Sequence, residues 1–189
     1  MSTLKTNTIQ AATGSTVNVA SGHVLSAPGH IVQLVEKQDK ANASTTSTSF
    51  TNTGVSGLNL SITPKLATSK IFMTVHLQME MNGGNTGFII FARDPAGTPV
   101  FFSNTGESAG LGGAGNTSNG ISKIFLSQGY SGINGQIVSH SGIDSPNTTS
   151  AITYGIHWGV NGSTGYYNRG VGSASYVTNS SISLMEIAQ

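Results

Sequence analysis

The stretch KIFMTVHLQMEM, residues 70–81, decides the fold class of this chain. Apolar residues occupy every second position, and the positions between them are polar, with Phe72 as the single exception. Successive side chains of a β-strand point to opposite faces, so this period predicts a half-buried strand of an antiparallel sheet. The apolar face comprises Ile71, Met73, Val75, Leu77, Met79 and Met81.

The same period recurs along much of the chain. AITYGIHWGV, residues 151–160, again alternates, and its pattern places Trp158 in the core rather than on a ligand-binding surface. Turn signals such as Asp94-Pro95 and Asn161-Gly162 separate such stretches. We therefore predict an all-β protein, an antiparallel jelly-roll-like β-sandwich. Further predicted strands cover residues 30–36, 57–63, 87–93, 121–127, 135–141, 163–169 and 181–187.

Charge is scarce in this chain of 189 residues. Charged residues make up 8% of it, against about 25% in an average protein, and the net charge is +1. We therefore expect neither nucleic acid nor an anionic membrane as a partner. Little charge repulsion opposes association, which favours an oligomer or a docked subunit. The chain has no cysteine, which excludes disulfides and thiol catalysis. Because its first residues are polar and its apolar runs are short, we expect neither a signal peptide nor a segment that inserts into a membrane.

Pro28-Gly29 marks the predicted domain boundary. Residues 1–27 contain only short alternating pieces that cannot bury much apolar surface by themselves. We interpret them as an N-terminal docking arm whose apolar residues pair with another chain, and residues 28–189 as the β-sandwich head. The docking residues of the arm are Leu4, Ile9, Val17 and Val19.

The glycine-rich segment 103–120 contains a match to the dinucleotide-binding spacing G-x-G-x-x-G at Gly110, Gly112 and Gly115. That spacing binds a pyrophosphate only where it opens a helix, with an acidic residue about 20 positions further on. Here a strand-like stretch follows, and the next acidic residue is Asp144. We interpret the segment as a surface loop and expect no cofactor.

Two other groupings suggest chemistry but lack the arrangement that it needs. Ser139, His140, Ser141 and Asp144 are neighbours on one strand, whereas a catalytic triad converges from separate elements. His76 shares the polar strand face with Gln78 and Glu80, which is at most part of a metal site. We predict no catalytic residues and no metal.

GYYNRG, residues 165–170, offers aromatic and guanidinium groups of the kind that bind sugars or proteins. Strand alternation places Tyr167 and Arg169 on one face and Tyr166 on the other. Tyr167 and Arg169 are therefore the candidate contacts for a glycan or a receptor.

Parts of the chain resemble a known family of proteins. STLKTNTIQ near the start, PGHIVQLV followed by TSKIFMTVHLQ, and the closing SSISLMEIAQ are similar to small virion-surface and fibre-head proteins of tailed bacteriophages, marine ones especially. The resemblance implies a homotrimer with an N-terminal docking arm and a β-rich head on the virion surface, assembled in the host cytoplasm. It implies phage capsid or tail proteins as partners.

Three functions remain open on this basis. The first is a non-enzymatic capsid decoration protein, a head-fibre or cement protein, because no coiled-coil shaft or short repeat precedes the head. The second is a short tail-fibre or receptor-binding protein that recognises host-surface glycans. The third is a glycan-cleaving enzyme, which needs two paired carboxylates. Only Glu80, Glu107 and Asp144 are candidates for that pair, and their spacing does not pair them.

Overall fold

A computed structural model describes residues 20, 23, 27–82, 86–102, 124–127, 133–170 and 173–189. The described residues form β-strands and one short 3-10 helix, η1 (Ser56–Leu58). The strands are β1 (Ile31–Asp39), β2 (Ala43–Thr45), β3 (Leu60–Ile62), β4 (Lys70–Asn82), β5 (Thr86–Arg93), β6 (Val100–Phe102), β7 (Ile124–Ser127), β8 (Ile133–Asp144), β9 (Ile152–Asn161), β10 (Gly165–Tyr167), β11 (Arg169–Gly170), β12 (Ser173–Val177) and β13 (Ser180–Ile187).

A six-stranded sheet is built around β4. One edge of β4 pairs with β8 along residues 71–82. Its other edge pairs first with β13, along residues 70–76, and then with β10, along residues 79–81. β1 pairs with the far side of β13, and β2 with the far side of β10. Every pairing is antiparallel, as the alternation in residues 70–81 predicts.

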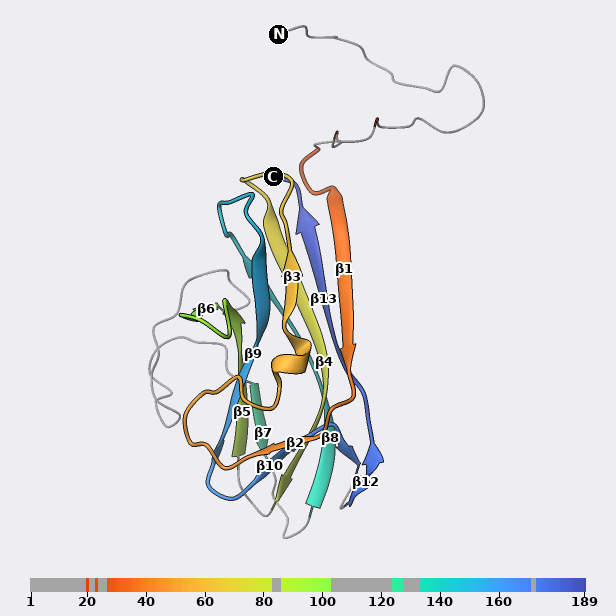
Figure 1. Cartoon of the computed structure of the whole chain (residues 1–189), viewed down its shortest axis with the longest axis vertical. Helices are drawn as coiled ribbons and strands as arrows, with labels where there is room; N and C mark the ends of the chain where they lie inside the picture. The colour runs from red at the N-terminus through yellow and green to blue at the C-terminus, as the bar shows by residue number, and fades with distance from the viewer. Residues whose placement is uncertain are drawn as a thin grey trace, which may run out of the picture.

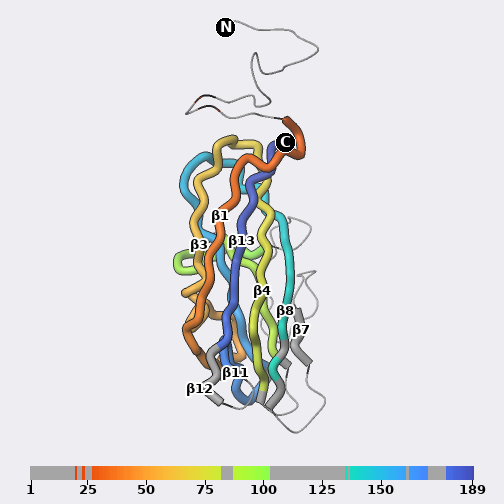
Figure 2. The backbone as a smooth tube through the Cα atoms, turned by 90° about the vertical axis from the view of Figure 1, so that its right-hand side faces the viewer, coloured from red at the N-terminus to blue at the C-terminus, as the bar shows by residue number. Residues whose placement is uncertain are grey.

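A five-stranded sheet packs face to face with the first, and the two form a sandwich (Figure 1 and Figure 2). Its central strand β5 pairs with β9 on one edge and with β6 and β7 on the other, and β3 pairs with β9. The chain changes from one sheet to the other after β2, β3, β4, β7, β8 and β9. β11 and β12 form a separate two-stranded ribbon. The predicted antiparallel sandwich is confirmed.

The core fills the space between the two sheets. The six residues assigned to the apolar face of residues 70–81 are each at most 2% exposed. Trp158 is 1% exposed and packs in the same cluster, which confirms its assignment to the core. On the part of β9 that faces the core, Trp158 is joined by Tyr154, Ile156 and Val160.

The outer face of the five-stranded sheet is also covered by the chain. Phe50 comes from the connection between β2 and η1 and packs edge-on against Phe88 of β5, with ring centroids 4.8 Å apart. Phe50 also packs against a second small cluster formed by Ile90, Ala92 and Phe101. Both faces of β5 are therefore buried, which explains the continuous apolar run Phe88–Ala92.

Polar groups join the two sheets at defined points. Asp144 of β8 accepts hydrogen bonds from Arg93 Nη1 at 3.1 Å and from the Tyr154 hydroxyl at 2.8 Å, both on the five-stranded sheet. Burial, together with the Asp144 charge, raises the pKa of Tyr154 far above its ordinary value. The tyrosine stays protonated and holds the carboxylate between the sheets.

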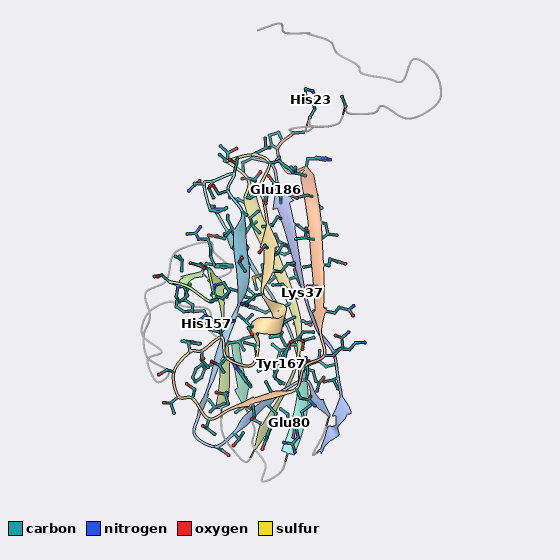
Figure 3. All side chains as sticks on the ribbon, viewed as in Figure 1. His23, Lys37, Glu80, His157, Tyr167 and Glu186 are labelled. Carbon is teal, nitrogen blue, oxygen red and sulfur yellow. The ribbon has the colours of Figure 1, made fainter. Side chains whose placement is uncertain are left out.

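Glu186 fixes the connection between β3 and β4. This fully buried carboxylate of β13 accepts hydrogen bonds from the backbone N–H groups of Lys65 and Leu66, at 2.8 and 3.0 Å, and from Gln33 Nε2. Burial alone would raise the pKa of Glu186, but these hydrogen bonds lower it below its ordinary value. Glu186 therefore remains charged in the folded protein. Figure 3 shows that it lies near the end of the head at which β1 begins.

Candidate functional site

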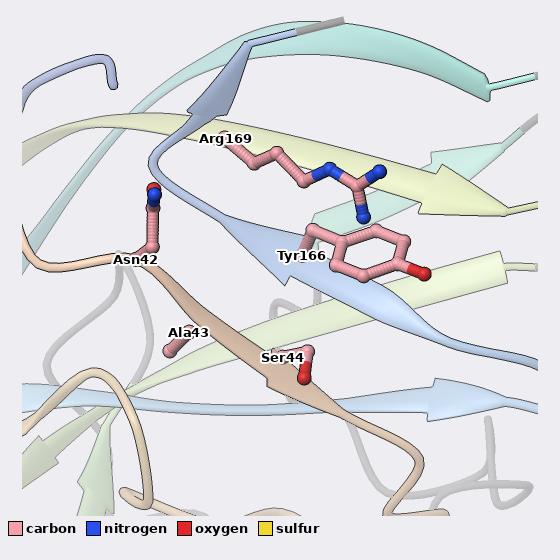
Figure 4. Close-up of a pocket in the computed structure, with 5 residues that line it drawn as sticks. All are labelled: Asn42, Ala43, Ser44, Tyr166 and Arg169. Carbon is pink, nitrogen blue, oxygen red and sulfur yellow. The ribbon is translucent and has the colours of Figure 1, made fainter. Parts of the chain in front are cut away.

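Tyr166 and Arg169 form the most distinctive surface pair among the described residues. The Arg169 guanidinium carbon lies 4.0 Å from the centroid of the Tyr166 ring, which is cation–π geometry. Tyr166 belongs to β10, and Arg169 begins β11 (Figure 4). The two side chains stack on the same face, which is the opposite of what strand alternation predicts for positions three apart.

The residue between the two strands explains this departure. Asn168 has a φ of 53°, the left-handed conformation, so the alternation restarts at Arg169. Its buried side chain holds that conformation, with Nδ2 donating to the Asp39 carbonyl at 2.8 Å and Oδ1 accepting from Ser180 Oγ at 2.6 Å. Asn tolerates the left-handed region better than other residues with a side chain.

The prediction that Tyr167 shares a contact surface with Arg169 is therefore wrong. Tyr167 is fully buried and packs edge-on against Trp158, with ring centroids 6.4 Å apart. Its hydroxyl donates to Asp39 Oδ2 at 3.1 Å. Burial is the largest cause that raises the pKa of Tyr167, so the hydroxyl stays protonated. Arg169 stays at the surface, and Tyr166 takes the place predicted for Tyr167.

A shallow cavity of about 230 Å³ adjoins the pair and is lined by Asn42, Ala43, Ser44, Tyr166 and Arg169 (Figure 4). The register places Ser44 of β2 and Glu80 of β4 on either side of Tyr166. An aromatic ring, a planar cation, an amide and a hydroxyl are the groups that bind sugar rings and their hydroxyls. Asn42 and Ser44 could not be predicted from the sequence as cavity residues, because only the pairing of β2 with β10 brings them next to Tyr166 and Arg169.

The neighbouring side chains of Ser139, His140 and Asp144 on β8 point in different directions. Ser139 lies on the outer face of β8 and shares a 2.8 Å hydrogen bond with His76 Nδ1. His140 faces the other way, and its ring stacks on the Phe91 ring with the ring centroids 5.1 Å apart. Burial lowers the pKa of His140. Asp144 lies further along the strand and bonds Arg93 and Tyr154. This is the divergence expected for neighbours on one strand.

The His76, Gln78 and Glu80 face does not form a metal site in the part of the chain that the structure describes. His76 is exposed and bonded to Ser139, whereas Glu80 is 1% exposed. Among the described residues, no three His, Asp or Glu side chains are grouped to hold a metal ion. The same residues include no helix long and apolar enough to span a membrane.

A second hollow lies over the outer face of the five-stranded sheet. It has a volume of about 480 Å³ and is lined by the connection 51–56, by Pro95 and Ala96, and by His157. His157 is 7% exposed, and its Nε2 donates to the Pro95 carbonyl at 2.9 Å. That bond holds the turn after β5 against β9, which makes His157 a structural residue.

Two sequence predictions fall on residues outside the described ranges. The docking residues Leu4, Ile9, Val17 and Val19 lie before residue 20, and the glycine-rich segment 103–120 lies between β6 and β7. Both remain predictions.

Comparison with known proteins gives a distant structural likeness. No family model and no curated protein matches this chain. Among solved structures it is similar to infectious bursal disease virus, Gt strain, at 12% identity and a TM-score of 0.33 over 92% of this chain. The Gx strain gives 10% identity and a TM-score of 0.31 over 90%. A mutant VP2 protein of the same virus, in derived T=1 particles, gives 12% identity and a TM-score of 0.32 over 92%.

All three similar structures come from infectious bursal disease virus. This chain spans only 40–42% of their length. Because the three TM-scores lie between 0.31 and 0.33, nothing about this chain is concluded from these likenesses. The resemblance to tailed-phage proteins has no support from a family model and remains an expectation.

Proposed function

We propose that this chain is a non-enzymatic virion structural protein, displayed on the particle as a capsid decoration protein and docked by residues 1–27. The observation that carries the proposal is the place where the N-terminal segment joins the sandwich. Gly29 N–H donates to the Ala188 carbonyl at 2.8 Å, and Ala188 N–H donates to the His30 carbonyl at 2.9 Å. These bonds fix Gly29 and His30 at one end of an elongated head, and His30 N–H donates to the Ala27 carbonyl at 2.9 Å (Figure 1).

The opposite end of the head carries the Tyr166–Arg169 cavity. β10 and β12 lie at that end, whereas β1 begins and β13 finishes at the other (Figure 1). A protein held by one end presents the other outward. This arrangement is what a docked surface subunit needs, and the resemblance of the sequence to virion-surface proteins points the same way.

Two carboxylates of the described head, Asp144 and Glu186, hold parts of it together. Asp144 joins the two sheets, and Glu186 fixes the connection between β3 and β4. A glycan-cleaving enzyme would need one acid to protonate the leaving group and a second to act beside it. Asp144 is bonded to Arg93 and Tyr154, which supports a structural rather than an enzymatic role.

Deletion of residues 1–27 tests the docking arm. The truncated head should keep its unfolding midpoint but no longer join particles that lack the protein. Intact protein added in the same way serves as the positive control. If the truncated head binds particles as well as the intact chain does, the docking proposal is wrong.

Gold-labelled antibody on intact virions tests the location. Gold over the capsid supports decoration, whereas gold confined to the tail supports the second candidate, a tail-fibre or receptor-binding protein. That candidate is favoured by the Tyr166–Arg169 pair beside its cavity. Absence of gold from both would contradict a virion role.

A binding measurement separates the two candidates at the level of residues. For a receptor-binding protein, Tyr166→Ala and Arg169→Ala should each weaken binding to host-surface glycans at least tenfold. Tyr167→Phe is the matched control, because it changes a buried tyrosine next in sequence. Equal binding by all three variants would rule out this cavity as the glycan site.

A further inference from the structure

A line of apolar side chains crosses the outer face of the six-stranded sheet. The register aligns Leu34 with Met185, Met185 with Phe72, and Phe72 with Ile143. Directly paired residues of antiparallel strands point to the same face, so these side chains stand next to one another. Ile31 and Ile187 form the next pair along β1 and β13. We call these residues the apolar row: Ile31, Leu34, Phe72, Ile143, Met185 and Ile187.

The apolar row lies open to solvent in the single chain. Ile31 and Leu34 are each 50% exposed. Among the described residues, Ile137 is the only other large apolar residue that is exposed to at least this extent. The other four members are partly exposed. Figure 2 looks onto this sheet, and no described segment crosses its strands. Adjacent exposed apolar side chains of this kind mark interaction surfaces.

The remainder of the same face is rich in hydroxyl groups. Below the apolar row, the register aligns Glu36, Ser183, Thr74 and Ser141, and then Gln38, Ser181, His76 and Ser139. Glu36 accepts a hydrogen bond from Ser183 Oγ at 3.2 Å. In these two lines Glu36 is the one residue with a full charge, and the register places Lys70 beside Ile187 on the same face. The face therefore carries two charges of opposite sign near the apolar row, so the repulsion between two such faces is small.

We propose that a second copy of this chain packs against this face, sheet on sheet, about a symmetry axis parallel to the strands. Such a two-fold axis places the apolar row on the apolar row of the partner and each hydroxyl line on its equivalent. Aligned face-to-face packing is an established arrangement of β-sheets. Both copies then present residue 27 at the same end, whatever that end binds. The contact is thus independent of the proposed virion role.

The face is large enough for such a contact. Four strands about 4.8 Å apart, paired over about eight residues of about 3.3 Å each, give a flat area of about 500 Å² per copy. Two copies would bury about 1,000 Å² in total, which reaches the lower limit for a specific interface. We therefore expect a pair that dissociates on dilution rather than a permanent one.

The first test compares Leu34→Glu with wild type by sedimentation over a concentration series. Wild type should reach the mass of two copies, and Leu34→Glu should weaken association at least tenfold, because it buries a charge in the contact. Ser61→Glu adds the same charge to an exposed position of β3, on the opposite sheet, and should associate like wild type. Both changes are at exposed positions, and circular dichroism checks that both variants are folded.

Two results would overturn the proposal. One is a wild-type protein that stays a single copy at the highest soluble concentration. The other is a Leu34→Glu variant that associates as tightly as wild type. If the wild-type protein forms an assembly of more than two copies, the proposed contact is supported only if Leu34→Glu dissociates that assembly.

A second test uses the absence of cysteine from the sequence. Ser183→Cys places one thiol near the middle of the proposed contact, and a short bis-maleimide should join two copies through it. Ser61→Cys is the control on the opposite sheet, and little linked product is expected from it. Equal linking of both variants would contradict a contact through this face.

Discussion

The two sheets of this sandwich differ in what covers their outer faces. The chain covers the five-stranded sheet itself, with Phe50 on Phe88 and the turn at Pro95 bonded to His157. No described segment covers the six-stranded sheet, where Leu34 is half exposed. Two sheets that share one core can therefore differ in the use of their outer faces. The outer face of the five-stranded sheet is packed within the fold, whereas that of the six-stranded sheet is accessible to a partner.

The largest effect is expected where the two sheets are joined. Asp144→Ala leaves Arg93 without its ion-pair partner and the Tyr154 hydroxyl without its acceptor. The free energy of unfolding should fall by about 4 kcal/mol, because the change breaks the ion pair with Arg93, whose side chain is 25% exposed, and also leaves the buried Tyr154 hydroxyl without an acceptor. Chemical denaturation measures it, with Glu36→Ala as a control on the same sheet. A loss below 1 kcal/mol would show that the sheets are held by apolar packing alone.

The second prediction compares two leucines on opposite faces of the same sheet. Leu77 is fully buried, whereas Leu34 is 50% exposed. Leu77→Ala should lower the free energy of unfolding by about 3 kcal/mol, because it removes core contacts and leaves a cavity. Leu34→Ala should cost less than about 1 kcal/mol in protein dilute enough to be a single copy. Equal losses would mean that the outer face is as buried as the core.

The third prediction concerns the cover of the five-stranded sheet. A methyl group at Gly159 would meet the Phe88 ring and lie 2.8 Å from the Ser49 carbonyl oxygen. Gly159→Ala should therefore displace the covering segment and destabilise the fold by about 2 kcal/mol, the usual cost of overpacking. Thermal unfolding measures the loss. An unchanged midpoint would show that this cover is loosely held.

The smallest effect is expected at Glu186. Its pKa is lower in the folded than in the unfolded chain, so its stabilisation is present above the unfolded-state pKa. It is lost as the pH falls through the folded-state pKa. Glu186→Gln should cost about 1 kcal/mol at neutral pH and make stability less dependent on pH in the acid range. Identical acid profiles for variant and wild type would assign the acid dependence to other carboxylates.

The sequence predicts the long strands well because each depends on a local period. The alternation in residues 70–81 and 151–160 matches β4 and β9. Phe72, the exception to the first pattern, belongs to the apolar row. The apolar side chain of Phe72 on an otherwise polar strand face is therefore a signal in the sequence for this surface. The other members of the apolar row come from β1, β8 and β13, and they cannot be identified without the strand register.

The candidate site was predicted less well, for a local reason. The pattern at residues 163–169 identifies a strand with Tyr and Arg side chains, but Asn168 adopts the left-handed conformation and places Arg169 over Tyr166 rather than beside Tyr167. That conformation depends on bonds to Asp39 and Ser180, which are distant in sequence. Strand periodicity carries no information about such long-range bonds.

The position of β13 between β1 and β4 has a consequence for synthesis. Gln33 and Glu186 are hydrogen-bonded although 153 residues separate them. At about 5–20 residues per second, the ribosome needs on the order of ten seconds or more to make that stretch. Throughout that time β1 lacks its strand partner, so the nascent chain presents an unpaired apolar strand that a chaperone could hold until β13 arrives.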